Sequence, residues 1–212
     1  MNVYLIRHGE STGNCTGKIQ GCMEFPLSEL GRRQVEAVAR HFKDIRLDYL
    51  YSSDLARAFE TAQAIGQAKD LTVHPWDKVR EVHLGPFQGL SREAIYEQFP
   101  LTKEKTILTS GVEGTETVEQ LTARCHHIIL QLQLAHKNDH VAIVTHGGFI
   151  SIFLMYILTG DKWSTYHRPF QIGNTSITHI EWVSENKPLI HYTNQTEHLE
   201  PLNAISSKLG LL

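Results

Sequence analysis

The stretch Val3-Tyr4-Leu5-Ile6-Arg7-His8-Gly9 has a counterpart far along the chain, Val141-Ala142-Ile143-Val144-Thr145-His146-Gly147. Each consists of an apolar run, one polar residue and then His-Gly. Apolar runs of this kind are typical of strands buried on both faces of a parallel sheet. If the two strands are central neighbours, their carboxyl ends meet at one edge of the sheet, where ligands of such folds bind. We therefore expect His8 and His146 to lie close together at that edge.

Strand and helix patterns alternate along the rest of the chain. Further strand patterns cover 47–51, 72–74, 176–183 and 189–193, and helical patterns follow Ser28 and cover 54–68, 117–136 and 149–158. Ser28, Thr117 with Gln120, and the run Ser52-Ser53-Asp54 are the expected helix caps. This alternation predicts an α/β fold with a mainly parallel central sheet, helices on both faces and one antiparallel edge strand.

The length of 212 residues suits one domain that spans the whole chain, 1–212. The periodic pattern loosens over about 82–116, where Gly85, Pro86, Gly89 and Pro100 interrupt it. We expect this segment to be an insertion that lies over one end of the sheet and shapes the substrate pocket.

Composition argues against several classes of partner. The net charge is −3 without a run of like charges, which does not favour a nucleic-acid groove or a basic membrane patch. No stretch is long and apolar enough to span a membrane, and no signal peptide is apparent. Cys15, Cys22 and Cys125 lack metal-binding spacing and suit reduced thiols. We expect a cytoplasmic protein without nucleic-acid or membrane partners, and leave open whether it forms a homodimer.

The chain has 13 histidines, but they are scattered without ligand spacing, so no metal site is predicted. Arg7 and Arg57 would instead provide fixed positive charge for a phosphate near the two histidines. Neutral imidazole is a nucleophile near pH 7, so one histidine can attack phosphorus directly. The arginines and a protonated His146 would then neutralise the phosphoryl oxygens, and Glu81, in the loop after a strand, would protonate the leaving group.

Several motifs together resemble the histidine phosphatase superfamily, which includes cofactor-dependent phosphoglycerate mutases and many small phosphatases. In chain order they are Arg7-His8-Gly9-Glu10-Ser11 with Asn14, Gln20-Gly21, Pro26-Leu27-Ser28, Ser52-Ser53-Asp54-Leu55-Ala56-Arg57-Ala58, Glu81-Val82-His83-Leu84-Gly85 and Thr145-His146-Gly147-Gly148. The resemblance runs in order from about residue 1 to 177. It implies a three-layer α/β/α sandwich that needs no metal and no cofactor.

The resemblance also implies a role for individual positions. His8 would be the phosphorylated nucleophile and Glu81 the proton donor, while Arg7, Arg57 and His146 hold the phosphoryl group. The substrate side would be lined by Asn14, Gln20, Gly21 and Gly147, together with His83 and Leu84, which resemble the broad-specificity phosphatases. The substrate would be a small phosphorylated metabolite.

Three segments depart from the family pattern and leave the shape of the substrate open: Pro86-Phe87-Gln88-Gly89, Glu24, and Gly114-Thr115-Glu116-Thr117 in place of a more usual Gly-Glu-Ser. Two alternatives to a phosphatase also stand. A phosphoglycerate mutase would need a basic clamp between the glutamate and the second histidine, which Lys103, Lys105 and Arg124 do not reproduce. A non-catalytic module that binds a phosphorylated ligand is disfavoured because every expected catalytic residue is present.

Overall fold

The computed structural model describes residues 1–103, 106–107, 110–185 and 187–202. Six strands form one sheet in the order β3-β2-β4-β1-β5-β6. Their bounds are β1 Asn2–Arg7, β2 Tyr49–Ser52, β3 Val73–Pro75, β4 His140–Thr145, β5 Ile177–Ser184 and β6 Lys187–Gln195. The first four strands in chain order are parallel, and β5 is antiparallel to both of its neighbours, β1 and β6. The mainly parallel sheet is confirmed, with the antiparallel strand β5 one place in from the edge and β6 outside it.

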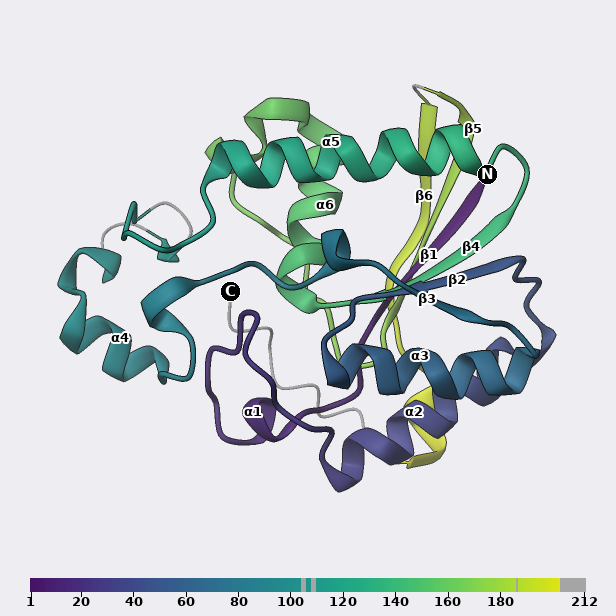
Figure 1. Cartoon of the computed structure of the whole chain (residues 1–212), viewed down its shortest axis with the longest axis horizontal. Helices are drawn as coiled ribbons and strands as arrows, with labels where there is room; N and C mark the ends of the chain where they lie inside the picture. Colours follow the sequence, from purple (N-terminus) through teal and green to yellow (C-terminus); the bar gives the residue numbers. More distant parts are fainter. Residues whose placement is uncertain (104–105, 108–109, 186, 203–212) are drawn as a thin grey trace.

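Helices cover both faces of this sheet (Figure 1). α2 (Glu29–His41) and α3 (Ala56–Lys69) lie on one face, and α5 (Val118–Ala135) and α6 (Gly147–Thr159) lie on the other. Two shorter helices, α1 (Thr12–Cys15) and α4 (Arg92–Gln98), stand beside the sheet. The 3₁₀ helices are η1 Phe42–Asp44, η2 Asp77–Val79, η3 Gly85–Phe87, η4 Pro100–Lys103, η6 Gly160–Thr165 and η7 Glu197–Leu202.

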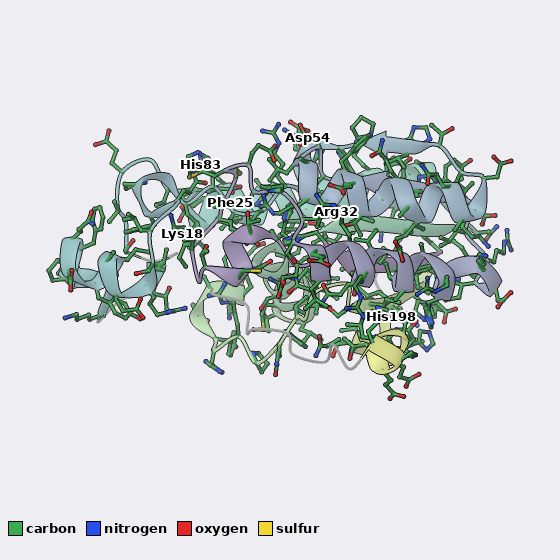
Figure 2. The ribbon with its side chains drawn as sticks, turned by 90° about the horizontal axis from the view of Figure 1, so that it is seen from below. Lys18, Phe25, Arg32, Asp54, His83 and His198 are labelled. Carbon is green, nitrogen blue, oxygen red and sulfur yellow. The ribbon has the colours of Figure 1, made fainter. Side chains whose placement is uncertain are left out.

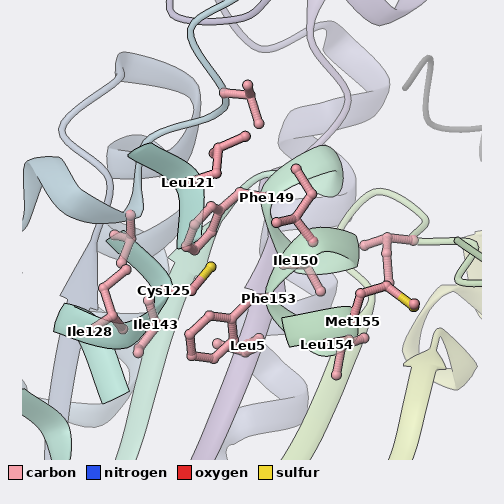
Figure 3. Packing of buried hydrophobic residues seen from close by; sticks show 14 of the residues in the cluster. Leu5, Leu121, Cys125, Ile128, Ile143, Phe149, Ile150, Phe153, Leu154 and Met155 are labelled. Atoms are coloured by element: carbon pink, nitrogen blue, oxygen red, sulfur yellow. The ribbon is translucent and has the colours of Figure 1, made fainter. Parts of the chain in front are cut away.

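The alternation of side chains along β1 divides the core between the two faces. Val3 and Leu5 belong to the cluster under α5 and α6, whereas Tyr4 and Ile6 belong to the cluster under α2 and α3. Figure 3 shows Leu5 and Ile143 packed below Phe149 and Phe153 of α6. Each fully buried side chain of this size contributes about 1.5–3 kcal/mol relative to exposure. Burial on both faces therefore fixes β1 and β4 at the centre of the sheet.

Two of the expected helix caps are confirmed, and the third differs. The Ser28 hydroxyl accepts a hydrogen bond from the Gly31 amide, and Thr117 and Gln120 form a reciprocal capping box. α3, however, begins at Ala56, and its N-cap Leu55 makes no side-chain bond. The candidates Ser53 and Asp54 are used elsewhere, because Ser53 contacts His146 and Asp54 pairs with Arg80. The Glu24 carboxylate takes the vacant position, at 3.1 Å from the Ala56 amide nitrogen.

The insertion and the C-terminal segment lie at different parts of the fold. η3, α4 and η4 extend to one side of the sheet, beside the loop that carries α1 (Figure 1). At the other end of the chain, η7 packs against α2 and buries Leu199. Leu209, Leu211 and Leu212 lie outside the described residues. None of the helices that the structure describes has the length and apolarity needed to cross a membrane.

A close contact between α2 and the loop after β1 gives a first testable prediction. A Cβ atom on Gly31 would lie 2.0 Å from the carbonyl oxygen of Glu10, so a side chain forces the backbone apart. We expect Gly31→Ala to lower the free energy of unfolding by about 1–3 kcal/mol, measured in urea. Arg33→Ala, at an exposed position of the same helix, should change it by less than about 0.5 kcal/mol. Equal stability of the two variants would contradict this packing.

Candidate active site

The two His-Gly turns meet at the carboxyl edge of the sheet. Arg7 and Thr145 are paired in the parallel β1–β4 register, and the His8 amide donates to the Thr145 carbonyl oxygen. The ring centroids of His8 and His146 lie 5.1 Å apart. The expected proximity of the two imidazoles is confirmed, and both rings are almost completely buried.

The His8 ring is held in one tautomer. Its Nδ1 lies 2.6 Å from the Gly9 carbonyl oxygen, which can only accept, so Nδ1 carries the hydrogen. Nε2 is then unprotonated, and it accepts a hydrogen bond from Arg57 Nε at 3.3 Å. Burial first, and then the charges of Arg57 and Arg7, hold the pKa of His8 well below its usual range. His8 is therefore a neutral imidazole with an available lone pair across the neutral pH range.

The second histidine, His146, is fully buried. Burial, with Arg57 and His8 next in importance, also holds the pKa of His146 well below its usual range. Its Nε2 lies 2.8 Å from the Ser53 hydroxyl oxygen. Its Nδ1 is buried without a hydrogen-bond partner among the described residues. A protonated His146 beside the charged oxygens of a phosphoryl group stays a prediction.

Two buried guanidinium groups flank the histidines. Arg57 donates to the carbonyl oxygens of Met23 and Gly21, each at 2.8 Å, in addition to His8. Arg7 donates through Nη1 to the Ile172 carbonyl oxygen at 2.7 Å. Burial lowers the pKa of Arg7 to about 10, which still leaves it charged at neutral pH. The side chains are held by backbone carbonyls, so their positive charge is fixed beside His8 before any ligand arrives.

Glycine at position 147 allows Arg7 to approach the start of α6. A Cβ atom there would lie 3.1 Å from Arg7 Nε and 3.3 Å from Arg7 Cδ. Arg7 Nε is itself buried without a hydrogen-bond partner in the described part of the chain. A buried donor without a partner is costly unless a ligand satisfies it. His146 Nδ1 is a second buried polar atom beside His8 that has no such partner among the described residues.

The carboxylate of Glu81 sits at the amino terminus of α6. Its Oε1 accepts from the amides of Val82 and Phe149 at 3.0 and 2.8 Å, and its Oε2 accepts from the Gly148 amide at 3.1 Å. Unpaired amides and the helix dipole make such a terminus favourable for negative charge. Glu81 also lines the same pocket as His8, so its carboxyl group faces the space where a ligand of His8 would bind.

One small pocket collects most of the predicted residues. It is lined by Arg7, His8, Asn14, Lys18, Ile19, Gln20, Gly21, Arg57, Glu81, Leu84, Gly147 and Gly148. Of the predicted site residues, only His146 and His83 do not line it. His146 is fully buried beside His8.

His83 lies outside the pocket and is exposed, whereas its neighbours Val82 and Leu84 are buried. Its Nδ1 lies 2.9 Å from the Gly114 carbonyl oxygen. Figure 2 shows His83 and Lys18 on the loops at one end of the molecule, away from His198 on η7.

Several residues that support the site were not predicted. Lys18 and Ile19 line the pocket directly before the predicted Gln20-Gly21, and Gly148 follows Gly147. Asn174 Nδ2 donates to the His8 carbonyl oxygen at 3.1 Å, and Thr61 Oγ1 accepts from the Gly9 amide at 3.1 Å. Lys18 was adjacent to a recognised motif and could have been inferred from it. The supporting role of Asn174 depends on tertiary contacts that no local pattern indicates.

Comparison with known proteins identifies the class. The family model of the histidine phosphatase superfamily (branch 1) matches residues 3–195. The chain belongs to this superfamily. It is therefore related to phosphatases and phosphoglycerate mutase-like enzymes, and the resemblance inferred from its motifs is confirmed.

Individual relatives cover most of the chain. It is 31% identical to phosphoglycerate mutase-like protein 4 of Arabidopsis thaliana, over 98% of this chain and 91% of that protein. It is 33% identical to a metal-independent phosphoserine phosphatase of the same plant, over 73% of this chain and 68% of that protein. A solved structure of a mutant phosphoserine phosphatase from Entamoeba histolytica, in complex with phosphoserine, matches with a TM-score of 0.76 and 30% identity over 93% of this chain and 98% of that chain. An enzyme of the phosphatase class is therefore favoured over a non-catalytic binding module.

Proposed function

We propose that the protein hydrolyses small phosphate monoesters through a phosphohistidine intermediate on His8, without a metal ion. The observation that carries the proposal is the state of the His8 ring, whose Nδ1 is bound to the Gly9 carbonyl oxygen while Nε2 bears the lone pair beside Arg57. A neutral nucleophile next to fixed positive charge is the arrangement that attack on a phosphate dianion requires.

In the first displacement, the Nε2 lone pair of His8 forms a bond to phosphorus and the bond from phosphorus to the leaving oxygen breaks. Arg7 and Arg57 stabilise the charge on the phosphoryl oxygens. The leaving oxygen takes a proton from Glu81. Oε2 suits this role because it accepts only one backbone bond, whereas Oε1 accepts two.

In the second displacement, water attacks the phosphohistidine. The Glu81 carboxylate, which accepts hydrogen bonds from three amides, takes the proton from that water. The phosphorus–nitrogen bond then breaks, His8 regains its lone pair and inorganic phosphate leaves. Glu81 thus alternates between acid and base, as microscopic reversibility requires for a double displacement.

The charge that a metal ion often supplies is provided here by side chains. Arg7 and Arg57 place two guanidinium groups at the pocket. Burial lowers the pKa of Arg7 only to about 10, so Arg7 stays charged at neutral pH. In the part of the chain that the structure describes, no three His, Cys, Asp or Glu side chains are grouped to hold a metal ion. A relative named as metal-independent supports the same chemistry for this chain.

A phosphatase is favoured over a mutase because Lys103 and Arg124, the two clamp candidates that the structure describes, do not line the pocket. Arg124 is paired with Glu116, and Lys103 lies exposed on η4. Lys105 lies outside the described residues. The positive side chains that line the pocket are Arg7, Lys18 and Arg57, within the residues the structure describes. This set suits one phosphoryl group and a small substrate. In a mixture of 3-phosphoglycerate and its bisphosphate cofactor, isomerisation of 3-phosphoglycerate that is faster than hydrolysis of either compound would contradict this choice.

The proposal is tested by assaying hydrolysis of p-nitrophenyl phosphate in the presence of excess EDTA. We expect turnover that EDTA leaves unchanged, because arginine side chains and not a metal stabilise the transition state. A screen of phosphate monoesters in the same buffer then identifies the preferred alcohol. Loss of activity on chelation, restored by a divalent metal ion, would overturn the metal-independent mechanism.

A further inference from the structure

We infer that Arg124 and Glu116 are positioning residues that set the location of Glu81, and so control proton transfer to the leaving group. This inference rests on the proposed function, since it assigns these two residues to the proton-donor step. Neither side chain lines the His8 pocket. Arg124 lies on α5, and Glu116 lies two residues before that helix begins.

The two side chains form a nearly buried ion pair. Arg124 Nη2 donates to Glu116 Oε2 at 3.0 Å, and Arg124 Nε lies 3.0 Å from Glu116 Oε1. The side chains are only 11% and 15% exposed. A pair so removed from water gains little stability after desolvation, although breaking it by removing one partner is costly. Such a pair is best explained by what it holds in place.

The pair holds the backbone on both sides of Glu81. Arg124 Nη1 donates to the Arg80 carbonyl oxygen at 3.0 Å, directly before Glu81. The Glu116 carboxylate accepts from the His83 amide at 3.1 Å, and the Glu116 amide donates to the His83 carbonyl oxygen at 2.7 Å. The segment that carries Glu81 is thus bound at three backbone atoms, all to this pair.

The same guanidinium also contacts the far side of the carboxylate site. Its carbon atom lies 4.6 Å from the centre of the Phe149 ring, which is a cation–π contact. The Phe149 amide in turn donates to Glu81 Oε1 at 2.8 Å. Arg124 therefore connects the loop that bears Glu81 to the helix terminus that receives its carboxylate. A displacement of a few tenths of an ångström at either end would move the proton donor relative to the leaving oxygen.

The experiment compares two substrates that differ in their need for a proton. p-Nitrophenolate is weakly basic and leaves without help, whereas an alkoxide, as from β-glycerophosphate, is strongly basic and needs a general acid. We expect Arg124→Met to lower kcat/KM for β-glycerophosphate by about 10–100-fold, part of the usual contribution of a general acid. The value for p-nitrophenyl phosphate should fall less than about threefold. kcat/KM is the correct parameter because it covers only the steps up to phosphorylation of His8.

Three further variants make the result decisive. Glu81→Gln should lower kcat/KM for β-glycerophosphate relative to p-nitrophenyl phosphate by a larger factor than Arg124→Met does. The double variant Glu81→Gln/Arg124→Met should show no greater loss than Glu81→Gln alone, as expected for residues that act through one group. Arg46→Met, which breaks an exposed ion pair with Asp48, should leave both substrates unaffected. If Arg124→Met does not fold by circular dichroism, Glu116→Gln takes its place with the same expected direction.

The outcomes separate this inference from the proposed function. Equal loss on both substrates, or no loss on either, in a variant that folds would overturn the positioning role while leaving His8 as the nucleophile. A wild-type protein that hydrolyses neither ester, or a His8→Ala variant with full activity, would instead remove the proposed function itself.

Discussion

Replacing His8 by alanine is expected to abolish hydrolysis of phosphate monoesters, with kcat reduced by at least about 10⁴-fold, as for other enzymes that lose a covalent nucleophile. The physical reason is that no other imidazole lines the pocket, among the described residues, and His8 is the one whose Nε2 contacts Arg57. The measurement is steady-state turnover together with intact-mass analysis of protein mixed rapidly with substrate at neutral pH. Wild type should carry one phosphoryl group, and the variant none.

The matched control for this variant is His74→Ala, which removes an exposed histidine in the middle of β3. It should keep both full turnover and the phosphoryl adduct. Retention of the adduct in His8→Ala would show that another residue is the nucleophile. Binding of inorganic phosphate to His8→Ala, measured as a rise in the thermal unfolding temperature, separates loss of chemistry from loss of the site. Arg7 and Arg57 remain in this variant, so phosphate should still bind.

Replacing Arg57 by glutamine should lower kcat/KM by about 10²–10³-fold, the usual effect of removing one preorganised donor to a phosphoryl or oxyanion group. It should also change the pH dependence. Only neutral His8 attacks, so activity is lost as pH falls through the pKa of His8. Arg57 is the largest charge that lowers this pKa, second only to burial. Its removal raises the pKa, and the acidic limb of the kcat/KM profile should move to higher pH.

Arg57→Lys distinguishes the two effects of Arg57. Lysine keeps the positive charge, so the acidic limb should stay near that of wild type. Arg57 reaches His8, Met23 and Gly21 with three different nitrogens, Nε, Nη1 and Nη2. The single nitrogen of lysine cannot occupy all three positions, so kcat/KM should remain low. An acidic limb in Arg57→Gln that coincides with that of wild type would refute the electrostatic effect of Arg57 on His8.

The sequence was most informative where function and local pattern coincide. The apolar runs that end at His8 and His146 predicted two central parallel strands, and the structure pairs them directly. Most of the predicted site follows from that single pairing, because residues at the carboxyl ends of neighbouring strands share one edge of the sheet. Arg57, at the start of a helix that follows the adjacent strand β2, is brought to the same edge by the same rule.

The sequence was least informative where a residue has two uses. Ser53 and Asp54 have the chemistry of helix caps, yet tertiary partners, His146 and Arg80, take both side chains. His83 follows Glu81 closely in sequence but is exposed and does not line the pocket, whereas its neighbours Val82 and Leu84 are buried. The lowered pKa of His146 could not be predicted either, because it depends on burial and on neighbouring cations that only the folded chain assembles.

The pairing of β1 with β4 also makes catalysis a signal of when the chain folds. The proposed nucleophile lies at residue 8, but His146 is supplied from beyond a long intervening stretch, and closing such a loop is slow and entropically costly. During synthesis, we expect the chain to be catalytically inactive until β4 and the turn after it have left the ribosome. The first turnover of substrate would then mark the moment at which the centre of the sheet closes. Substitutions that delay this closure would lengthen the lag before activity without lowering its final level.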